Sequence, residues 1–297
     1  MNAKERGFLL LTSQLGDPER KPLTVAQFRT LASRMTQTER PLSDRDLLPT
    51  DLLALGYSRG EAERIVTLLA GEEALERYIS RGMGRACVPI SRISDGYPLA
   101  LRKRLGLDAP GCLWAKGDLS LLSTQMIALV GSRDLCGPNR LFSERVGLEA
   151  ARQGITLVSG NARGADRTAQ DACLANGGKV ISVVADKLEE CSLRENVLYL
   201  SEDSYNLPFT SQRALSRNRV IHGLGYLTLV AQCDFGAGGT WDGTTRNLSK
   251  NWSPVFCFAD GSAAVVELEQ MGATPITIDR LADLKALQSN LTQMEIT

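Results

Sequence analysis

Three glycine-rich segments carry arginine and hydroxyl side chains at points where an apolar run ends. They are "GSR" at 131–133, "SGNARGAD" at 159–166 and "GAGGT" at 236–240. Glycine lets the backbone approach a ligand closely, hydroxyls and free amides donate hydrogen bonds, and arginine pairs with phosphate in a bidentate geometry. The residues concerned are Gly131, Ser132, Arg133, Ser159, Gly160, Arg163, Gly164, Gly238, Gly239 and Thr240. Together they predict a phosphate-binding crevice.

The elements that would position these residues are short strands alternating with helices. After residue 126 the runs "MIALVGS", "ITLVSG", "KVISVVAD", "GYLTLVAQC" and "SPVFCFAD" are almost continuously apolar. Such runs are typical of strands buried on both faces of a parallel sheet. Their alternation with helical patterns predicts an α/β fold with a Rossmann-like, doubly wound, mostly parallel sheet. Because ligands of such sheets bind beyond the carboxyl ends of the strands, the three loops should share one edge.

A fourth segment, "SRNRVI" at 216–221, places Arg217 and Arg219 around Asn218 and then turns apolar. We interpret it as a tight loop at the mouth of the crevice, where its arginines would join Arg133, Arg163 and Arg167. Gathered arginines give a locally positive surface even on a neutral protein. The alternative is a salt-bridged helix start that Asn218 caps.

The chain divides by composition into four parts. Residues 1–85 predict a small helical domain, similar to SAM or helix-hairpin-helix domains, in which Thr24 and Ser58 are helix N-caps. These helices could contact a DNA backbone or form a small bundle that contacts another protein. Residues 86–122 predict a connector that packs on the core through the strand "CLWAKG". Residues 123–280 are predicted to form the Rossmann-like DNA- or nucleotide-binding domain, which includes a strand at 275–278. Residues 281–297 are predicted to form a C-terminal helix and tail, and the helical pattern begins at 279.

Bulk composition narrows the function classes. The 297 residues contain 34 Lys and Arg against 34 Asp and Glu, so overall charge does not point to nucleic acid. The 7 cysteines are scattered and none forms a CxxC pair, which is typical of a reducing cytoplasm. We expect no signal peptide and no membrane span, because apolar runs are short.

Residues for other chemistry are scarce. His222 is the only histidine, and in an apolar run it is expected to be a hydrogen-bonded core residue. No Ser-His-Asp set, metal cluster, Walker lysine or GxGxxG fingerprint can be assembled. We therefore expect no catalytic residue, no metal and no cofactor.

The order of short motifs resembles the DprA/Smf family of DNA-processing proteins. The motifs are "YP" (97–98), "CLWAKG" (112–117), "ALVGSR" (128–133), "SGNARGAD" (159–166), "LSED" (200–203), "SRNRVI" (216–221) and "GGT" (238–240), within roughly residues 5–278. The resemblance implies an extended Rossmann-like domain that binds single-stranded DNA, a homodimer, and a RecA-type recombinase as partner during transformation. It implies a DNA-binding face made of Arg133, Gly160, Arg163, Gly164, Asp166, Arg217, Asn218 and Arg219.

The chain also departs from the family pattern. Ala169 and Gln170 stand where an Ala-His pair is usual, and "FGAGGTWDGTTRN" replaces a segment that contains a lysine. We expect no C-terminal winged helix, which many members carry.

The function predicted first is a non-catalytic single-stranded DNA-binding protein in DNA processing and recombination: RecA loading, transformation or uptake of mobile-element DNA. A nucleotide-ligand sensor using the same crevice is the first alternative. The second is a nucleotide phosphoribohydrolase of the LOG type, for which Gly243 replaces the expected glutamate and only Asp242 lies nearby.

Overall fold

The computed structural model describes residues 1–37 and 46–287. The strands are β1 (Val88–Ser91), β2 (Cys112–Gly117), β3 (Met126–Val130), β4 (Thr156–Ser159), β5 (Val180–Val184), β6 (Val197–Glu202), β7 (Thr228–Val230), β8 (Val255–Phe258) and β9 (Thr274–Ile276). In the described part of the chain they form one 9-stranded sheet in the order β1-β2-β6-β5-β4-β3-β7-β8-β9. The two pairings that involve β2 are antiparallel, and all others are parallel. The predicted α/β fold with a mostly parallel sheet is confirmed.

The helices alternate with the strands from β3 onward. They are α1 (Ala3–Thr12), α2 (Val25–Thr36), α3 (Pro49–Ala54), α4 (Arg59–Leu69), α5 (Glu72–Gly84), α6 (Leu99–Leu105), α7 (Gly137–Arg152), α8 (Ala165–Ala175), α9 (Ser211–Leu224), α10 (Gly238–Lys250) and α11 (Ala263–Gln270). The described residues also form four 3-10 helices: η1 (Gly106–Asp108), η2 (Leu119–Ser123), η3 (Leu188–Glu190) and η4 (Ile278–Asp283). No helix within the described residues is long and apolar enough to cross a membrane.

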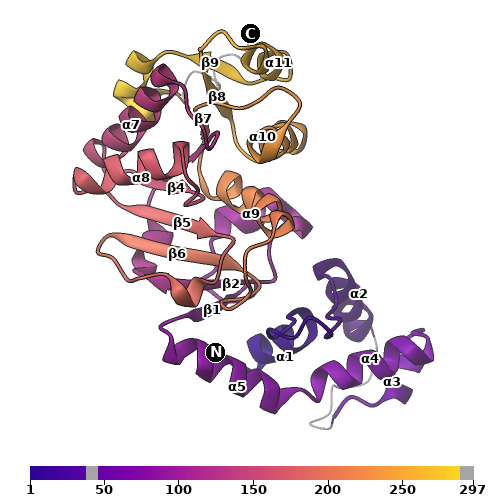
Figure 1. Cartoon of the computed structure of the whole chain (residues 1–297). Coiled ribbons are helices and arrows are strands. Elements are labelled where there is room, and N and C mark those ends of the chain that lie inside the picture. Colours follow the sequence, from indigo (N-terminus) through magenta and orange to yellow (C-terminus); the bar gives the residue numbers. More distant parts are fainter. Residues whose placement is uncertain (38–45, 288–297) are drawn as a thin grey trace.

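Alternate residues of each central strand face two different cores. On one face Ile127 and Leu129 pack with α7 and α8, while on the other Ala128 and Val130 pack with α6 and α9. Both faces of the sheet are therefore buried from solvent. This explains why apolar residues follow one another along the strands instead of alternating with polar ones. Figure 1 shows α7 and α8 on one side of the sheet and α9 nearer the other.

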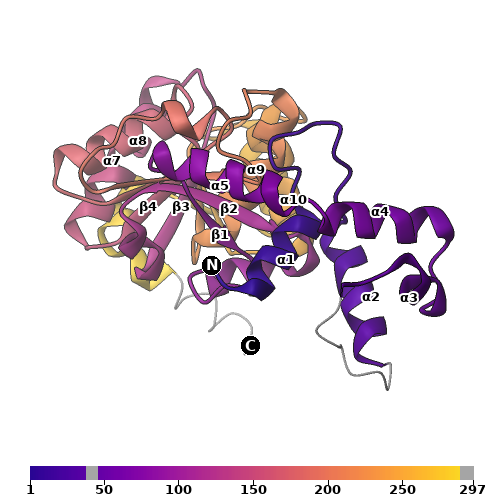
Figure 2. The same ribbon diagram turned by 90° about the horizontal axis from the view of Figure 1, so that it is seen from below.

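The N-terminal helices lie at the β1 end of the sheet, and β9 and α11 at the opposite end (Figure 1). Thr24 and Ser58 cap α2 and α4 with reciprocal capping boxes, as the sequence predicts. Helices α1 to α4 share a separate apolar cluster centred on Leu52 and Ile65, and they extend beside the sheet (Figure 2). In contrast, α5 and residues 8–10 of α1 belong to the core of the sheet itself, where Tyr78 packs on Trp114. The boundary near residue 86 remains a prediction.

Several local predictions need correction. The segment 86–122 supplies not only β2 but also β1, a short strand that contains Pro89 and so sits at the sheet edge, where a missing amide costs nothing. Strand β6 was not expected, although it is central and pairs with both β2 and β5. The closing segment begins as the 3-10 helix η4. The strand expected at 275–278 spans 274–276.

The interpretation of 216–221 as a tight loop is wrong, because the segment lies inside α9. Thr210 caps this helix by accepting a hydrogen bond from the Arg213 amide. Ile221 and Leu224 then lie on its buried face. The same segment is not a helix start, and Asn218 does not cap α9.

Candidate functional site

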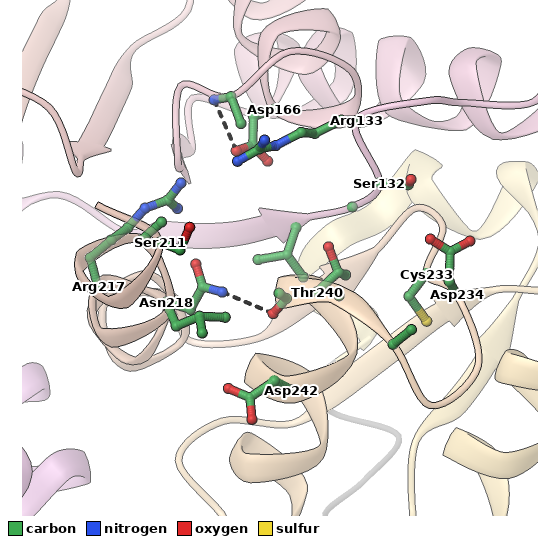
Figure 3. A pocket seen from close by; sticks show the side chains of 18 of the residues that line it. Ser132, Arg133, Asp166, Ser211, Arg217, Asn218, Cys233, Asp234, Thr240 and Asp242 are labelled. Carbon is green, nitrogen blue, oxygen red and sulfur yellow. Dashed lines mark hydrogen bonds between the residues drawn. The ribbon is translucent and has the colours of Figure 1, made fainter. Parts of the chain in front are cut away.

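A pocket of about 680 Å³ lies at the carboxyl ends of β3 and β7. Here β4 pairs with one side of β3 and β7 with the other, so the chain changes direction across the sheet and leaves a crevice. We call it the central pocket (Figure 3). Of the residues expected to bind phosphate, its wall contains Gly131, Ser132, Arg133, Asp166, Arg217, Asn218, Gly238, Gly239 and Thr240. The predicted loops from three separate parts of the chain therefore meet.

Arg217 is the buried cation of this wall. Only 8% of the residue is exposed, and its guanidinium makes no hydrogen bond or ion pair with any described residue; the Nε atom is fully buried without a partner. Burial lowers its pKa, and the carboxylate of Asp166 opposes this effect. A buried guanidinium with unused donors is costly, and an anion in the pocket would satisfy it.

Gly160 makes room for that guanidinium. A Cβ atom at position 160 would lie 1.8 Å from Nη1 and 2.3 Å from Cζ of Arg217. Any side chain here would therefore displace the arginine. Gly160 does not line the pocket, and its role is to position Arg217.

Asp166 holds the loop between β4 and α8 in shape. Its Oδ2 atom accepts hydrogen bonds from the amides of Gly160 (3.1 Å) and Ala162 (3.2 Å), and the residue is 5% exposed. Burial raises the pKa of this carboxyl, whereas the guanidinium of Arg217 and the two amides lower it. Because an ionised carboxylate repels phosphate, Asp166 does not bind phosphate directly. It balances the charge of Arg217 and holds the loop in place through its hydrogen bonds to the two amides.

Gly164 fixes the loop that carries Arg133. It has a φ of +86°, and a Cβ atom would lie 2.4 Å from the carbonyl oxygens of Ser132 and Arg133. The amide of Ala165 donates to the Ser132 carbonyl at 3.1 Å. Only glycine allows this approach, which places Arg133 at the edge of the central pocket.

The start of α10 forms the opposite wall. Its N-cap residue is Ala237, whose side chain accepts no hydrogen bond, so the amides of the first turn lack a side-chain cap. Asn218 donates from Nδ2 to the Gly239 carbonyl at 2.9 Å and thereby ties α9 to this turn. Figure 3 shows Arg217 and Asn218 on one side of the pocket and Thr240 on another. A helix N-terminus and an arginine thus border the same space, an arrangement that attracts an anion.

Comparison with known families identifies the chain. The family model described as DNA recombination-mediator protein A matches residues 89–277. The chain belongs to the DNA recombination-mediator protein A family. The central pocket lies within the matched region, and the resemblance that the motifs suggested is confirmed.

Curated relatives and solved structures show which proteins the chain resembles. It is 32% identical over 158 residues to the DNA processing protein DprA of Streptococcus pneumoniae, covering 50% of this chain and 55% of that protein. The Bacillus subtilis DprA is 31% identical over 163 residues, with 51% and 54% covered. The chain thus spans about half the length of the curated relatives it matches. The solved structure of the S. pneumoniae protein superposes with a TM-score of 0.70 at 24% identity, covering 93% of this chain and 96% of that one.

A second solved structure is that of DprA from Helicobacter pylori, described in terms of its single-stranded DNA binding mode. Its TM-score is 0.58 at 23% identity, and it covers 69% of this chain and 96% of that chain. At these identities the likeness shows the fold, which agrees with the Rossmann-like sheet.

The structure keeps several expected residues out of the pocket. Ser159 is fully buried and accepts a hydrogen bond from Gln170 Nε2, so it belongs to the core. Gln170, the residue that departs from the family's Ala-His pair, supports the loop in this way. Arg163 is exposed and pairs with Asp134 at 2.8 Å, just outside the pocket.

Arg219 also lies away from the pocket. It forms an ion pair with Glu202 and donates from Nε to the Asp108 carbonyl at 2.7 Å. Because Arg217 and Arg219 are two residues apart on a helix, they point to different sides. Through these two contacts Arg219 links α9 to β6 and to η1.

Sequence reasoning missed part of the wall. The first two turns of α9 contribute Ser211, Ala214 and Leu215. Thr210, three residues before Arg213, was an available N-cap signal for this helix. His222 is fully buried and bonded to Thr228, as its apolar surroundings predict. Within the described residues no cluster of three or more His, Cys, Asp or Glu could hold a metal ion.

Proposed function

We propose that this protein binds single-stranded DNA at the central pocket and acts in DNA processing and recombination. The observation that carries the proposal is the buried, unpartnered guanidinium of Arg217, which faces the uncapped start of α10 across the pocket. A phosphate between them would accept hydrogen bonds from Arg217, from Arg133 and from the amides of the first turn of α10.

The pocket favours a single strand over a duplex. A volume of about 680 Å³ accommodates one nucleotide with its sugar and base, whereas a base pair holds its phosphates outside such a space. Phe209 and Leu215 give the wall apolar surface and are 45% and 40% exposed. Phe235 and Trp241, whose rings meet edge to face at 5.2 Å near this wall, add an aromatic surface on which a base can stack.

The family supports a wider role. We propose that the protein acts as a homodimer in the cytoplasm, and that it delivers single-stranded DNA to a RecA-type recombinase in transformation or in uptake of mobile-element DNA. The single-stranded DNA binding mode described for the H. pylori relative supports the choice of ligand. We propose binding without turnover, because Gly243 replaces the glutamate of the hydrolases and the Asp242 carboxylate faces Arg246 at 3.8 Å.

Replacing Arg217 tests this proposal. We expect Arg217→Met to weaken binding of fluorescent oligo-dT by roughly ten- to a hundredfold, since a charged hydrogen bond contributes about 1.5–3 kcal/mol. The slope of log affinity against log salt should become shallower by about 0.7. The measurement is a titration at two salt concentrations, with the matching duplex as a second ligand.

Arg219→Ala is the matched control, because it removes the same charge from the same helix outside the pocket. It should lower thermal stability and leave affinity within about twofold, the scale of a screened distant charge. Wild-type protein that fails to bind oligo-dT overturns the proposal. Release of base from a nucleoside monophosphate, abolished by Asp242→Asn, would establish the hydrolase instead.

A further inference from the structure

A second depression adjoins the central pocket at the same edge of the sheet. It has a volume of about 530 Å³ and shares Arg133 and Asp134 with the central pocket. Its other charged residues are Arg140 on α7, Arg163 in the loop after β4, and Arg167 and Asp171 on α8. We call it the arginine trough.

The two depressions have opposite charge balance. The wall of the central pocket contains two arginines and four aspartates: Arg133, Arg217, Asp134, Asp166, Asp234 and Asp242. The trough contains four arginines and two aspartates. Asp134 is already paired with Arg163, which leaves Asp171 as the one trough carboxylate without an ion pair in the described part of the chain. The central pocket thus suits one phosphate, and a polyanion is favoured only where it continues into the trough.

Two trough arginines have unused donors. Neither Arg140 nor Arg167 makes a side-chain hydrogen bond or ion pair with the residues that the structure describes, and both are exposed. They lie near the N-terminal ends of α7 and α8, where the helix dipoles add positive potential. Their positions are therefore open to phosphate.

The basic surface ends beyond the trough. The next depression along α7 and α8 shares Arg140 but contains Glu144 and Asp171 against Arg140 and Arg145. Arg145 is itself paired with Glu149 at 2.8 Å. A ligand path that follows positive charge thus runs from Arg217 past Arg133 to Arg140 and Arg167, and stops there.

We propose that the arginine trough is a second phosphate subsite, so that the ligand is a strand of several nucleotides that runs from the central pocket across Arg133 into the trough. This inference rests on the proposed function and deepens it. The central pocket alone would serve equally for a mononucleotide, whereas the trough has a role only for a longer strand.

The test compares ligands of increasing length on the full chain. The trough variant carries Arg140→Gln with Arg167→Gln, and Arg217→Met serves as the central-pocket variant. The control carries Arg59→Gln with Arg77→Gln, which removes the same charge from exposed sites on α4 and α5. The probes are deoxythymidine 5′-monophosphate, followed by calorimetry, and fluorescent oligo-dT of increasing length. Thermal unfolding verifies that each variant is folded.

The trough variant should bind the monophosphate as the wild type does and lose tenfold or more in affinity for the longer oligonucleotides. Loss of two phosphate contacts should make its salt slope shallower by about 1.4. A folded trough variant with wild-type affinity for every length overturns the subsite, as does a wild type that binds the monophosphate as tightly as the longest strand. Wild-type protein that binds none of these probes overturns the proposed function itself.

Discussion

Arg217 and His222 are both buried on α9, yet only His222 has partners. Its Nδ1 atom lies 3.1 Å from Thr228 Oγ1 and 3.2 Å from Asn247 Nδ2, within a network that includes Ser253. None of these four residues lines the central pocket, so His222 links α9 to β7 and α10 outside it. One ring nitrogen of His222 is bonded in this network, while its Nε2 atom is buried without a partner and away from the pocket wall. Arg217 differs because its unpaired donors belong to a residue of that wall, where a ligand can reach them.

His222 should make stability depend on pH. Burial, aided by the nearby Arg217 guanidinium, lowers its pKa from 6.5 to about 3. The unfolded chain therefore takes up the proton first as pH falls, and the stabilisation, complete above pH 6.5, is lost toward pH 3. Between pH 7 and pH 5 this group alone should cost about 2 kcal/mol of unfolding free energy.

Urea unfolding of the wild type and of His222→Gln at both pH values measures this effect. The glutamine does not titrate, so the difference in stability loss between the two proteins isolates His222 and cancels other groups such as Asp166. Equal losses in the two proteins would show that His222 is not buried in its neutral form.

At the scale of elements, the loop between β4 and α8 and the middle of α9 act as one unit. The loop is fastened by Asp166, and its Gly160 leaves the space that the Arg217 guanidinium fills. The position of the buried cation therefore depends on a residue that does not line the pocket. The ends of strands and the starts of helices supply the backbone amides that border the central pocket. The packing of the β4–α8 loop against α9 decides where the positive charge of Arg217 lies.

Gly160→Ala should reproduce the binding defect of Arg217→Met. The added Cβ atom collides with the end of a flexible side chain, so the guanidinium is displaced while the fold survives. We expect oligo-dT affinity to fall by roughly tenfold or more, at a cost in stability within the usual 1–3 kcal/mol of overpacking. Gly7→Ala, with no atom within 4 Å of the new methyl, is the control. Unchanged affinity in a folded Gly160→Ala protein would contradict the role given to Arg217.

At the scale of the whole molecule, the N-terminal helices stabilise the sheet without lining the site. Tyr78 of α5 packs edge to face on Trp114 of β2 at 5.3 Å, and its hydroxyl lies 2.9 Å from Ser204 Oγ. Gly82 lies against the same ring, where a Cβ atom would be 2.7 Å from it. Among the residues that the structure describes, the wall of the central pocket comes from positions between 130 and 242.

A fragment of residues 86–297 should therefore bind oligo-dT but unfold more easily. The fragment lacks α5, which packs on Trp114 and shields it from solvent. Exposing one large buried side chain lowers the free energy of unfolding by at least about 2 kcal/mol. Thermal unfolding and titration of the fragment beside the full chain measure both properties. A folded fragment that has lost all affinity would show that residues 1–85 contribute to the site, which would favour the alternative in which these helices contact DNA.

The sequence determined the strands β3, β4, β5, β7 and β8, their alternation with helices, and the glycine loops after β3 and β4. It did so because these features depend on local signals: continuous apolar runs, helical periodicity and glycine at strand ends. It also located the central pocket at the strand ends, since a doubly wound sheet brings successive loops to one edge.

Only the tertiary structure decided which of the predicted arginines could reach the pocket. Arg217 and Arg219 share a motif, but the direction of each on α9 sends one to Gly160 and the other to Glu202. Likewise, β6 pairs with β2 although the two strands are distant in sequence. The packing of α7 on α8 brings Arg140 and Arg167 into the same depression. Helix phase and long-range packing leave no trace in a short motif, so charge placement had to come from the fold.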